Sequence, residues 1–215
     1  MTANNDFVGL NLDSRTEMVE SLQRRIRSCR LCPCFDQGPH RFAGGADNKI
    51  MLIGQAPSKP RGPQGRPFGV GNGHLRLFRW LEEAGFEEEE FRSKTYMTSI
   101  TKCYPGPSPG GKGDRRPGKD EIAACSDFLR EELELLRPPL ILPVGQMAIG
   151  IILGEMKLSE AVGKRFQQHF DGWNASVIPL LHPSGASLWN NLPENQALVQ
   201  KAIKLILETK TDLGL

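Results

Sequence analysis

Cysteines are the residues of this sequence whose spacing most directly suggests chemistry. The chain has five cysteines among its 215 residues. Cys29 and Cys32 form a C-x2-C pair that one metal ion or cluster can bridge, and Cys103 and Cys125 can complete a site of four thiolates. A tetrahedral zinc ion and a [4Fe–4S] cluster both fit this set, and buried thiols without a metal are the alternative. Cys34 could replace Cys32 as a ligand, but we expect it to be a leftover free thiol.

A glycine-rich stretch is the second candidate for chemistry. It contains Gly-Gln-Ala-Pro-Ser at 54–58 and Gly-Arg-Pro-Phe-Gly at 65–69. Glycines let the backbone approach a ligand closely, and successive N–H groups can hold an oxygen or a phosphate. The stretch is not a P-loop, because the sequence has no G-x-x-x-x-G-K-[ST]. Phe68 is unusual as a core residue in so polar a loop and could instead form a flat wall for a planar ligand.

His182 is the third candidate, at the end of an apolar run and ahead of Pro183 and Ser184. An imidazole in such a place can donate a hydrogen bond to a developing anion or protonate it. The sequence has four histidines, and only this one directly follows a predicted strand. A structural histidine that neighbouring groups satisfy fits the spacing almost as well.

Apolar periodicity predicts the elements that must position these residues. We expect strands at 50–53, 95–100, 140–145 and 175–181, and helices at 14–28, 74–84, 119–136, from 146 onward and at 194–208. Ser14 is predicted to cap the first helix, with Glu17 completing a capping box. Alternating strands and helices indicate an α/β fold with a parallel sheet covered on both faces. Such sheets bind ligands outside the carboxyl ends of their strands, where we expect residues 54–57, residues 99–103 and His182.

Length and composition limit the class of protein. A chain of 215 residues suits a single domain spanning 1–215, with 1–13 expected to be a flexible tail. The polar start is not a signal peptide and no apolar run is long enough for a membrane span, so we expect a cytoplasmic protein in which disulfides do not form. The net charge is only +2, so a nucleic-acid partner must be argued from local charge. The acidic run at 87–90 is expected to be a solvated face.

Taken together, the motifs resemble the uracil-DNA glycosylase superfamily, and most closely its family 4, the iron–sulfur type. The resemblance runs from Cys29 to the last predicted helix and so covers most of the chain. The matching segments, in order, are C-R-L-C at 29–32, G-Q-A-P-S at 54–58, G-R-P-F-G at 65–69, T-S-I-T-K-C-Y-P at 98–105, A-C at 124–125, P-V-G at 143–145 and H-P-S at 182–184.

The resemblance implies a three-layer α/β/α fold with a central four-stranded parallel sheet. It also implies a structural [4Fe–4S] cluster that braces loops reaching toward DNA, with four cysteines as its ligands: Cys29, Cys32, Cys103 and Cys125. The implied activity is that of a monofunctional DNA glycosylase of base-excision repair, which hydrolyses the N-glycosidic bond of a deaminated base, with uracil first. The implied partner is DNA containing such a base, with no nucleotide cofactor and no membrane, and we expect a monomer that associates with the nucleoid when bound to DNA.

Residue roles follow from the same resemblance. Phe68 would stack on the flipped base, Ser99 would face the edge of the base, and His182 would stabilise the leaving base anion. Gln55 and Ala56 would line the sugar and base pocket, and Gln55 is the second catalytic candidate. The segment 102–119 holds five basic residues against one acid, and the expected DNA contacts are Lys59, Arg61, Arg66, Arg115, Arg116, Ser184 and Leu188.

Three departures from the family pattern bear on activity. Gln55 replaces the Glu of the family 4 motif, and Ala56 stands where family 1 has its water-activating Asp. Ser99 replaces the Asn that reads the edge of uracil, and a hydroxyl is shorter and less directional than an amide. The alternatives are therefore a glycosylase that prefers hypoxanthine or xanthine, or a non-catalytic damage-binding protein with the same fold. Leu188 or Trp189 is expected to act as the wedge that fills the gap in the base stack.

Overall fold

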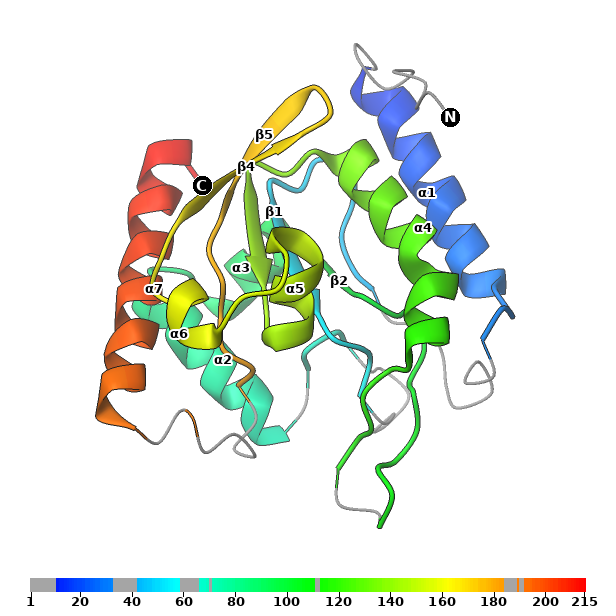
Figure 1. Ribbon diagram of the computed structural model, residues 1–215. Helices are drawn as coiled ribbons and strands as arrows, with labels where there is room; N and C mark the ends of the chain where they lie inside the picture. The colour runs from blue at the N-terminus through cyan, green and yellow to red at the C-terminus, as the bar shows by residue number, and fades with distance from the viewer. Residues whose placement is uncertain are drawn as a thin grey trace.

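The computed structural model describes residues 11–32, 42–58, 66–69, 71–110, 113–183, 189 and 192–215. Figure 1 shows helices and strands alternating along most of the chain. The elements are α1 (Leu12–Ser28), β1 (Ile50–Gly54), α2 (Gly71–Glu83), α3 (Glu88–Lys94), β2 (Thr95–Ser99), α4 (Lys119–Leu136), β3 (Leu140–Pro143), α5 (Gln146–Leu153), α6 (Leu158–Ala161), β4 (Phe166–Phe170), β5 (Trp173–Val177) and α7 (Pro193–Leu213).

The sheet has the order β2-β1-β3-β5-β4. Strands β1, β2, β3 and β5 run parallel, as predicted, but a fifth strand, β4, pairs antiparallel with β5 and corrects the expected count of four. Phe170 and Trp173 stack at 4.2 Å across the β4–β5 turn. The predicted last strand was also placed too late, because β5 ends at Val177 and the chain then continues to His182 with a single bridge from Leu180 to Val144.

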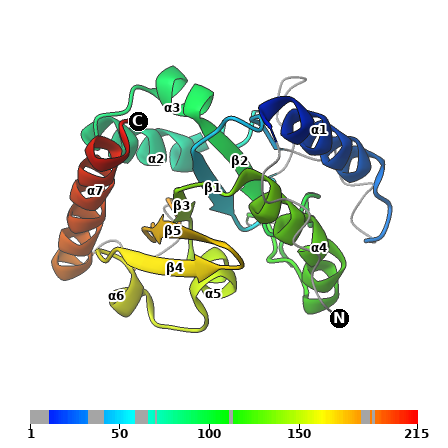
Figure 2. The same cartoon turned by 90° about the horizontal axis from the view of Figure 1, so that it is seen from above.

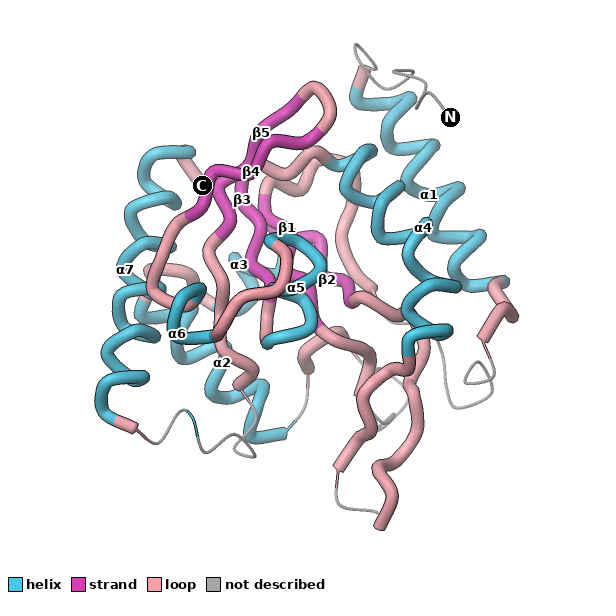
Figure 3. The backbone as a smooth tube through the Cα atoms, in the orientation of Figure 1, coloured by secondary structure: helices cyan, strands magenta, loops and turns pink. Residues whose placement is uncertain are grey.

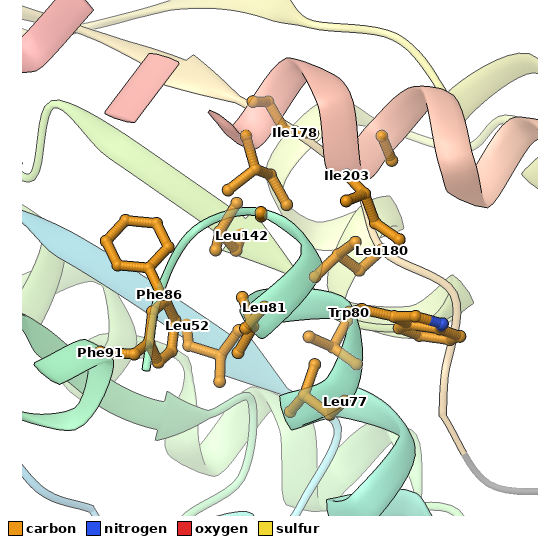
Figure 4. Close-up of a cluster of buried hydrophobic side chains, with 14 of the residues drawn as sticks. Leu52, Leu77, Trp80, Leu81, Phe86, Phe91, Leu142, Ile178, Leu180 and Ile203 are labelled. Carbon is orange, nitrogen blue, oxygen red and sulfur yellow. The ribbon is translucent and has the colours of Figure 1, made fainter. Parts of the chain in front are cut away.

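Helices cover both faces of the sheet, as Figure 2 shows from above, and an apolar cluster fills the space on each face. Neighbouring residues of β1 pack on opposite faces of the sheet, because successive side chains of a strand point to opposite faces. Leu52 packs with residues of α2, α3 and α7, in the cluster drawn in Figure 4. Ile53 packs with residues of α1, α4 and α5 on the other face. Each such fully buried aliphatic side chain contributes about 1.5–3 kcal/mol, so the two clusters fix the sheet that carries the site.

The first helix begins earlier than predicted. The side chain of Asn11 accepts a hydrogen bond from the Ser14 amide at 2.8 Å, so Asn11 is the N-cap and α1 starts at Leu12. The expected Ser14 cap is therefore wrong, because Ser14 already lies inside the first turn. Leu12 and Asp13 belong to this helix rather than to a tail, and residues 1–10 lie outside the described residues. None of the helices in the described part of the chain is long and apolar enough to cross a membrane.

The connections at the carboxyl ends of the strands leave the body of the molecule at one end, which is the lower end in Figure 1. The tube in Figure 3 shows the segment between β2 and α4 as two adjacent legs that project from this end. Hydrogen bonds from Ser108 to Gly113 at 2.9 Å and from Arg115 to Gly106 at 3.0 Å join the two legs. A projecting loop that includes Arg115 and Arg116 therefore lies at the end of the molecule to which the carboxyl ends of the strands point.

Candidate active site

A cavity of about 150 Å³ lies at the carboxyl ends of β1 and β2. All five residues predicted to bind the base line it: Gln55, Ala56, Phe68, Ser99 and His182. They come from the segments that follow β1 and β5 and from the last residue of β2. As predicted, they lie together at the carboxyl ends of the strands. Their roles toward a ligand remain predictions, but the structure brings the predicted set into one place.

Phe68 forms one wall of the cavity in a strained conformation. Its φ is 53°, in the left-handed region that a bulky aromatic residue rarely adopts. A Cβ atom added at Gly54 would lie 2.8 Å from Cζ of the Phe68 ring. Gly54 is therefore required for the ring to lie this close to the end of β1. Strain of this kind persists only where surrounding contacts hold it, and it is concentrated at functional sites.

Helix α3 supplies the contacts that hold the loop carrying Phe68. Arg92 donates a hydrogen bond to the carbonyl of Pro67 at 3.0 Å and is itself held by Glu88 at 2.9 Å. Arg66, at the start of the same loop, pairs with Glu89 at 2.6 Å. The acidic run at 87–90 was expected to be a solvated face, and Glu87 and Glu89 are indeed exposed. Glu88 is half-buried and holds Arg92 against the loop that carries Phe68.

His74 is a cavity residue that the sequence reasoning missed. It lies in α2 and lines the cavity, and its Nε2 is 3.0 Å from Oε1 of Glu88 in α3. Burial opposes ionisation of Glu88, but hydrogen bonds from Arg92 and His74 outweigh it and lower the pKa of Glu88. No sequence signal singled out His74, because only the packing of α2 against α3 brings it to the cavity.

His182 stands at the mouth of the cavity and is exposed on one side. Its ring packs on Gly145, where an added Cβ atom would lie 3.2 Å from Cβ of the histidine and where φ is +86°. Desolvation by the surrounding protein atoms lowers the pKa of His182, and the charge of Arg116 lowers it further. The imidazole is therefore neutral at pH 7, and it can donate a hydrogen bond without carrying a charge.

Ser99 closes the deep end of the cavity and is only 5% exposed. Its Oγ lies 2.8 Å from the carbonyl oxygen of Thr101, to which the hydroxyl donates. The backbone on either side is tied to the loop after β1 by bonds from the amides of Ile100 and Thr101 to the carbonyls of Gly54 and Gln55. The position and the hydrogen-bonding direction of Ser99 are thus set by the protein before any ligand arrives.

A buried ion pair lies beneath Ser99. Nζ of Lys102 is 2.7 Å from Oε2 of Glu132, and both side chains are at most 1% exposed. The ammonium group also donates to Oγ1 of Thr98 and to the carbonyl of Ser99, each at 2.7 Å. The hydroxyl groups of Tyr96 and Thr98 donate to the Glu132 carboxylate, and burial beside this charge raises the pKa of Tyr96. Lys102 was counted among the basic residues of a DNA-binding loop, which is wrong because its charge is buried and paired.

The four predicted ligand cysteines come from three separate segments. Cys32, Cys103 and Cys125 are buried, Cys29 is half-buried, and none of the four forms a disulfide. Cys32 packs against Cys103, and Sγ of Cys125 accepts a bond from the Lys102 amide at 3.5 Å. Burial raises the pKa of Cys125 to about 11, and the nearby Cys32 and Cys29 contribute to this shift. The four thiols therefore gather in one region, while Cys34 lies outside the described residues.

The spacing of these thiols bears on what they can hold. Within the described ranges, no three His, Cys, Asp or Glu side chains are grouped closely enough to hold a metal ion. A zinc site needs four ligands around one atom. In a [4Fe–4S] cluster each thiolate binds a different iron, so the sulfurs stand farther apart. The gathered thiols are the donor type that both groups take, and either group on these four residues stays a prediction.

The predicted DNA contacts are only partly described. Arg66 and Arg116 are exposed, although Arg66 pairs with Glu89. Arg115 forms two hydrogen bonds of 2.7 and 2.6 Å with Glu121. Contacts from any of these three residues to DNA remain predictions. Four further candidates lie outside the described residues: Lys59, Arg61, Ser184 and Leu188. Trp189, the second candidate wedge, is half-buried and packs against the cluster of Figure 4.

Comparison with known proteins gives a consistent result. The sequence profile of the uracil DNA glycosylase superfamily matches residues 42–206. A type-4 uracil-DNA glycosylase of Saccharolobus solfataricus is 30% identical over 80% of this chain and 78% of its own length. The type-4 enzyme of Thermotoga maritima is 28% identical over 80% of this chain and 84% of its own. A type-5 uracil-DNA glycosylase of Pyrobaculum aerophilum is 29% identical over 80% of this chain and 75% of its own.

Proposed function

The chain belongs to the uracil DNA glycosylase superfamily, and we propose that it is a monofunctional DNA glycosylase that hydrolyses the N-glycosidic bond of a deaminated base, uracil above all, in base-excision repair. One observation carries the proposal: a single cavity at the strand ends combines an aromatic wall at Phe68, a polar reader at Ser99 and a neutral imidazole at His182. Type-4 uracil-DNA glycosylases are among its relatives over most of both lengths.

Recognition begins with extrusion of the base from the helix. A base inside a duplex cannot be reached, so it is flipped into a pocket at a cost of a few kcal/mol. Stacking on Phe68 offsets part of this cost, since stacking of a base on an aromatic side chain is worth about 1–3 kcal/mol. The exposed guanidinium group of Arg116, and that of Arg66 once it is released from Glu89, would contact phosphates without reading sequence.

Bond cleavage separates charge between the sugar and the base. As the glycosidic bond breaks, its electron pair leaves with the base, which becomes an anion, and positive charge builds on the sugar. The neutral imidazole of His182 donates a hydrogen bond to that anion, and one such fixed donor lowers a barrier by about 3–4 kcal/mol. Water then attacks the cationic sugar carbon and loses a proton to the solvent.

Gln55 and Ala56 line the part of the cavity that bears on how the attacking water is activated. Ala56 carries no carboxylate, so the attack relies on the electrophilicity of the sugar cation rather than on a strong general base. The side-chain amide of Gln55 can accept a hydrogen bond from the attacking water and so orient it. Gln55 is therefore a catalytic residue in this proposal, with a smaller contribution than that of His182.

We also propose that Cys29, Cys32, Cys103 and Cys125 hold a [4Fe–4S] cluster. The gathering of thiols from the segment after α1, the segment after β2, and α4 supports this assignment. When bound, the cluster supplies four strong thiolate bonds that tie these segments together. The segment after β2 continues into the projecting loop that carries Arg116, so the cluster braces a loop that faces DNA.

Single-turnover excision assays test the proposed activity. Oligonucleotides containing uracil, hypoxanthine or xanthine, each single-stranded and paired, are incubated with excess holoprotein, and abasic sites are scored by alkaline cleavage. We expect excision of uracil. Binding of damaged DNA without excision of any base would overturn the catalytic proposal and favour the non-catalytic damage-binding protein.

The cluster is tested by composition and by Cys103→Ser. The wild-type protein, purified without oxygen, is expected to be brown, with absorbance near 400 nm and about four irons per chain. Cys103→Ser removes one ligand and should bleach this absorbance. A colourless wild-type protein that contains one zinc ion would contradict the assignment.

A further inference from the structure

We propose that Ser99 reads the base only as a hydrogen-bond acceptor, so that the enzyme selects bases with a protonated ring nitrogen beside a carbonyl group. This class contains the deaminated bases uracil, hypoxanthine and xanthine, and also the normal bases thymine and guanine, so it is broader than uracil alone. The inference rests on the proposed function and specifies the substrate class of the same cavity.

The direction of the Ser99 hydroxyl is fixed by its partner. Oγ of Ser99 lies 2.8 Å from the carbonyl oxygen of Thr101. A carbonyl oxygen cannot donate, so the hydroxyl must use its only proton in this bond. Lone pairs are all that the oxygen can offer to a ligand. An asparagine amide would instead offer both a donor and an acceptor.

The residues around Ser99 prevent it from turning to a donor role. The carbonyl of Ser99 accepts a bond of 2.7 Å from the buried ammonium of Lys102, which Glu132 holds from the other side. The amide of Thr101 is tied to the carbonyl of Gln55 at 3.3 Å. Turning the hydroxyl toward a ligand would leave the Thr101 carbonyl without this bond, in a segment where both residues are buried.

The chemistry of the bases then decides what fits. Uracil has an N–H at N3, and hypoxanthine and xanthine have one at N1, each beside a carbonyl group. The ring nitrogens of cytosine and adenine at the same positions carry a lone pair and no proton. They would therefore repel the lone pairs of the Ser99 oxygen and could not form the hydrogen bond. A site built around one hydrogen bond strongly rejects an analogue that cannot form it. Thymine has the same N–H as uracil, and guanine has the same N–H as hypoxanthine. The exclusion of these two normal bases must therefore come from the methyl group of thymine and the 2-amino group of guanine, and not from Ser99.

Ser99→Ala removes the acceptor and provides the test. Excision of uracil, hypoxanthine and xanthine is measured at single turnover for both proteins, with wild-type excision expected for all three. The variant should lose about tenfold on each of them, because a single buried neutral hydrogen bond is lost in every case. Thr95→Val is the matched control. It removes a buried hydroxyl without a hydrogen-bond partner from the far end of β2, and it should leave all three rates unchanged.

Binding separates this inference from the proposed catalysis. The affinity of each protein is measured for oligonucleotides carrying non-cleavable 2′-fluoroarabino analogues of deoxyuridine or deoxycytidine. Wild type should prefer the uridine analogue, and Ser99→Ala should reduce that preference by about tenfold. A preserved preference in the variant would overturn the role of Ser99, and wild-type excision of uracil without hypoxanthine or xanthine would overturn the broader class. If binding prefers the uridine analogue and depends on Ser99, but no base is excised, the proposed role of Ser99 would be supported and the catalytic proposal refuted.

Discussion

The base cavity and the thiol site lie on neighbouring parts of the chain but are built in different ways. Protein contacts hold the walls of the cavity in place. The Phe68 ring packs on Gly54 and its loop is bonded to α3, the His182 ring packs on Gly145, and the Ser99 hydroxyl donates to the carbonyl of Thr101. The thiols come from three segments that the fold brings together, and three of the four are buried. The cavity is thus preorganised by packing, whereas under the proposed function a bound cluster would also tie the thiol segments together.

Lys102 joins the two regions. Its ammonium group holds the carbonyl of Ser99, and its amide donates to Sγ of Cys125. The short segment from Ser99 to Lys102 therefore contains both the residue proposed to recognise the base and a contact to Cys125, a proposed cluster ligand. If the regions are as distinct as their construction indicates, variants can damage one of them while leaving the other intact.

The largest expected effect comes from Lys102→Met. The variant leaves the Glu132 carboxylate buried without its counter-ion, and breaking a buried pair in this way costs about 3–5 kcal/mol. Denaturant unfolding of the holoprotein should show this loss in the free energy of unfolding, and the absorbance near 400 nm reports the thiol site in the same samples.

Arg25→Met is the matched control for Lys102→Met. Arg25 pairs with Glu131, the neighbour of Glu132, but its side chain is 55% exposed. Exposed pairs contribute about 0–1 kcal/mol, so this variant should unfold almost as the wild type does. Equal losses in the two variants would show that the buried pair has no special role beneath the cavity.

His182→Ala should damage only the cavity. Removing the single fixed donor to the leaving base should slow single-turnover excision of uracil by about 100-fold. DNA affinity, the absorbance near 400 nm and unfolding should remain close to wild type. His169→Ala, at an exposed position on β4, is the control and should have no effect. An unchanged rate in His182→Ala would exclude the proposed role of the imidazole.

Gly54→Ala tests whether the packing of Phe68 is as tight as the structure indicates. The new methyl group would lie 2.8 Å from the ring, so the ring must move away from its stacking position. Excision should fall by about tenfold through weaker stacking on the flipped base. Gly150→Ala, in α5 with nothing within 4 Å of the added atom, should not alter excision. If Phe68→Leu abolishes the effect of Gly54→Ala, the two residues act as one unit.

The sequence predicted the parts of the fold that local patterns determine. The bounds of α4 match the prediction, and β1 and β2 match it to within a residue, because buried apolar runs and a helical face are strong signals. Strand β4 was missed because alternate residues of Phe166–Phe170 are exposed and polar, which gives a weak signal at an edge. The N-cap was misplaced because Asn11 and Ser14 are both good caps, and only the structure shows which one accepts.

Site residues that stand in a sequence motif could be predicted. Site residues that only tertiary packing brings to the cavity could not. Gln55, Phe68, Ser99 and His182 were found because each stands in a recognisable motif. His74 could not be found, since its place depends on how α2 meets α3. The burial of Lys102 was equally hidden, because its partner Glu132 lies 30 residues away on a helix. Charge counted along a sequence does not reveal which charges are paired inside the fold.

The smallest expected effect is an absence of pH dependence, and it tests the state of His182. Desolvation and the charge of Arg116 lower the pKa of His182 below its ordinary value of 6.5. The imidazole is then already neutral at pH 7, and raising the pH further removes no proton from it. The single-turnover rate for uracil should therefore be constant from about pH 7 to 8.5. A mechanism that needs the protonated ring would instead lose about tenfold in rate per pH unit above the pKa, and such a slope would contradict the neutral donor.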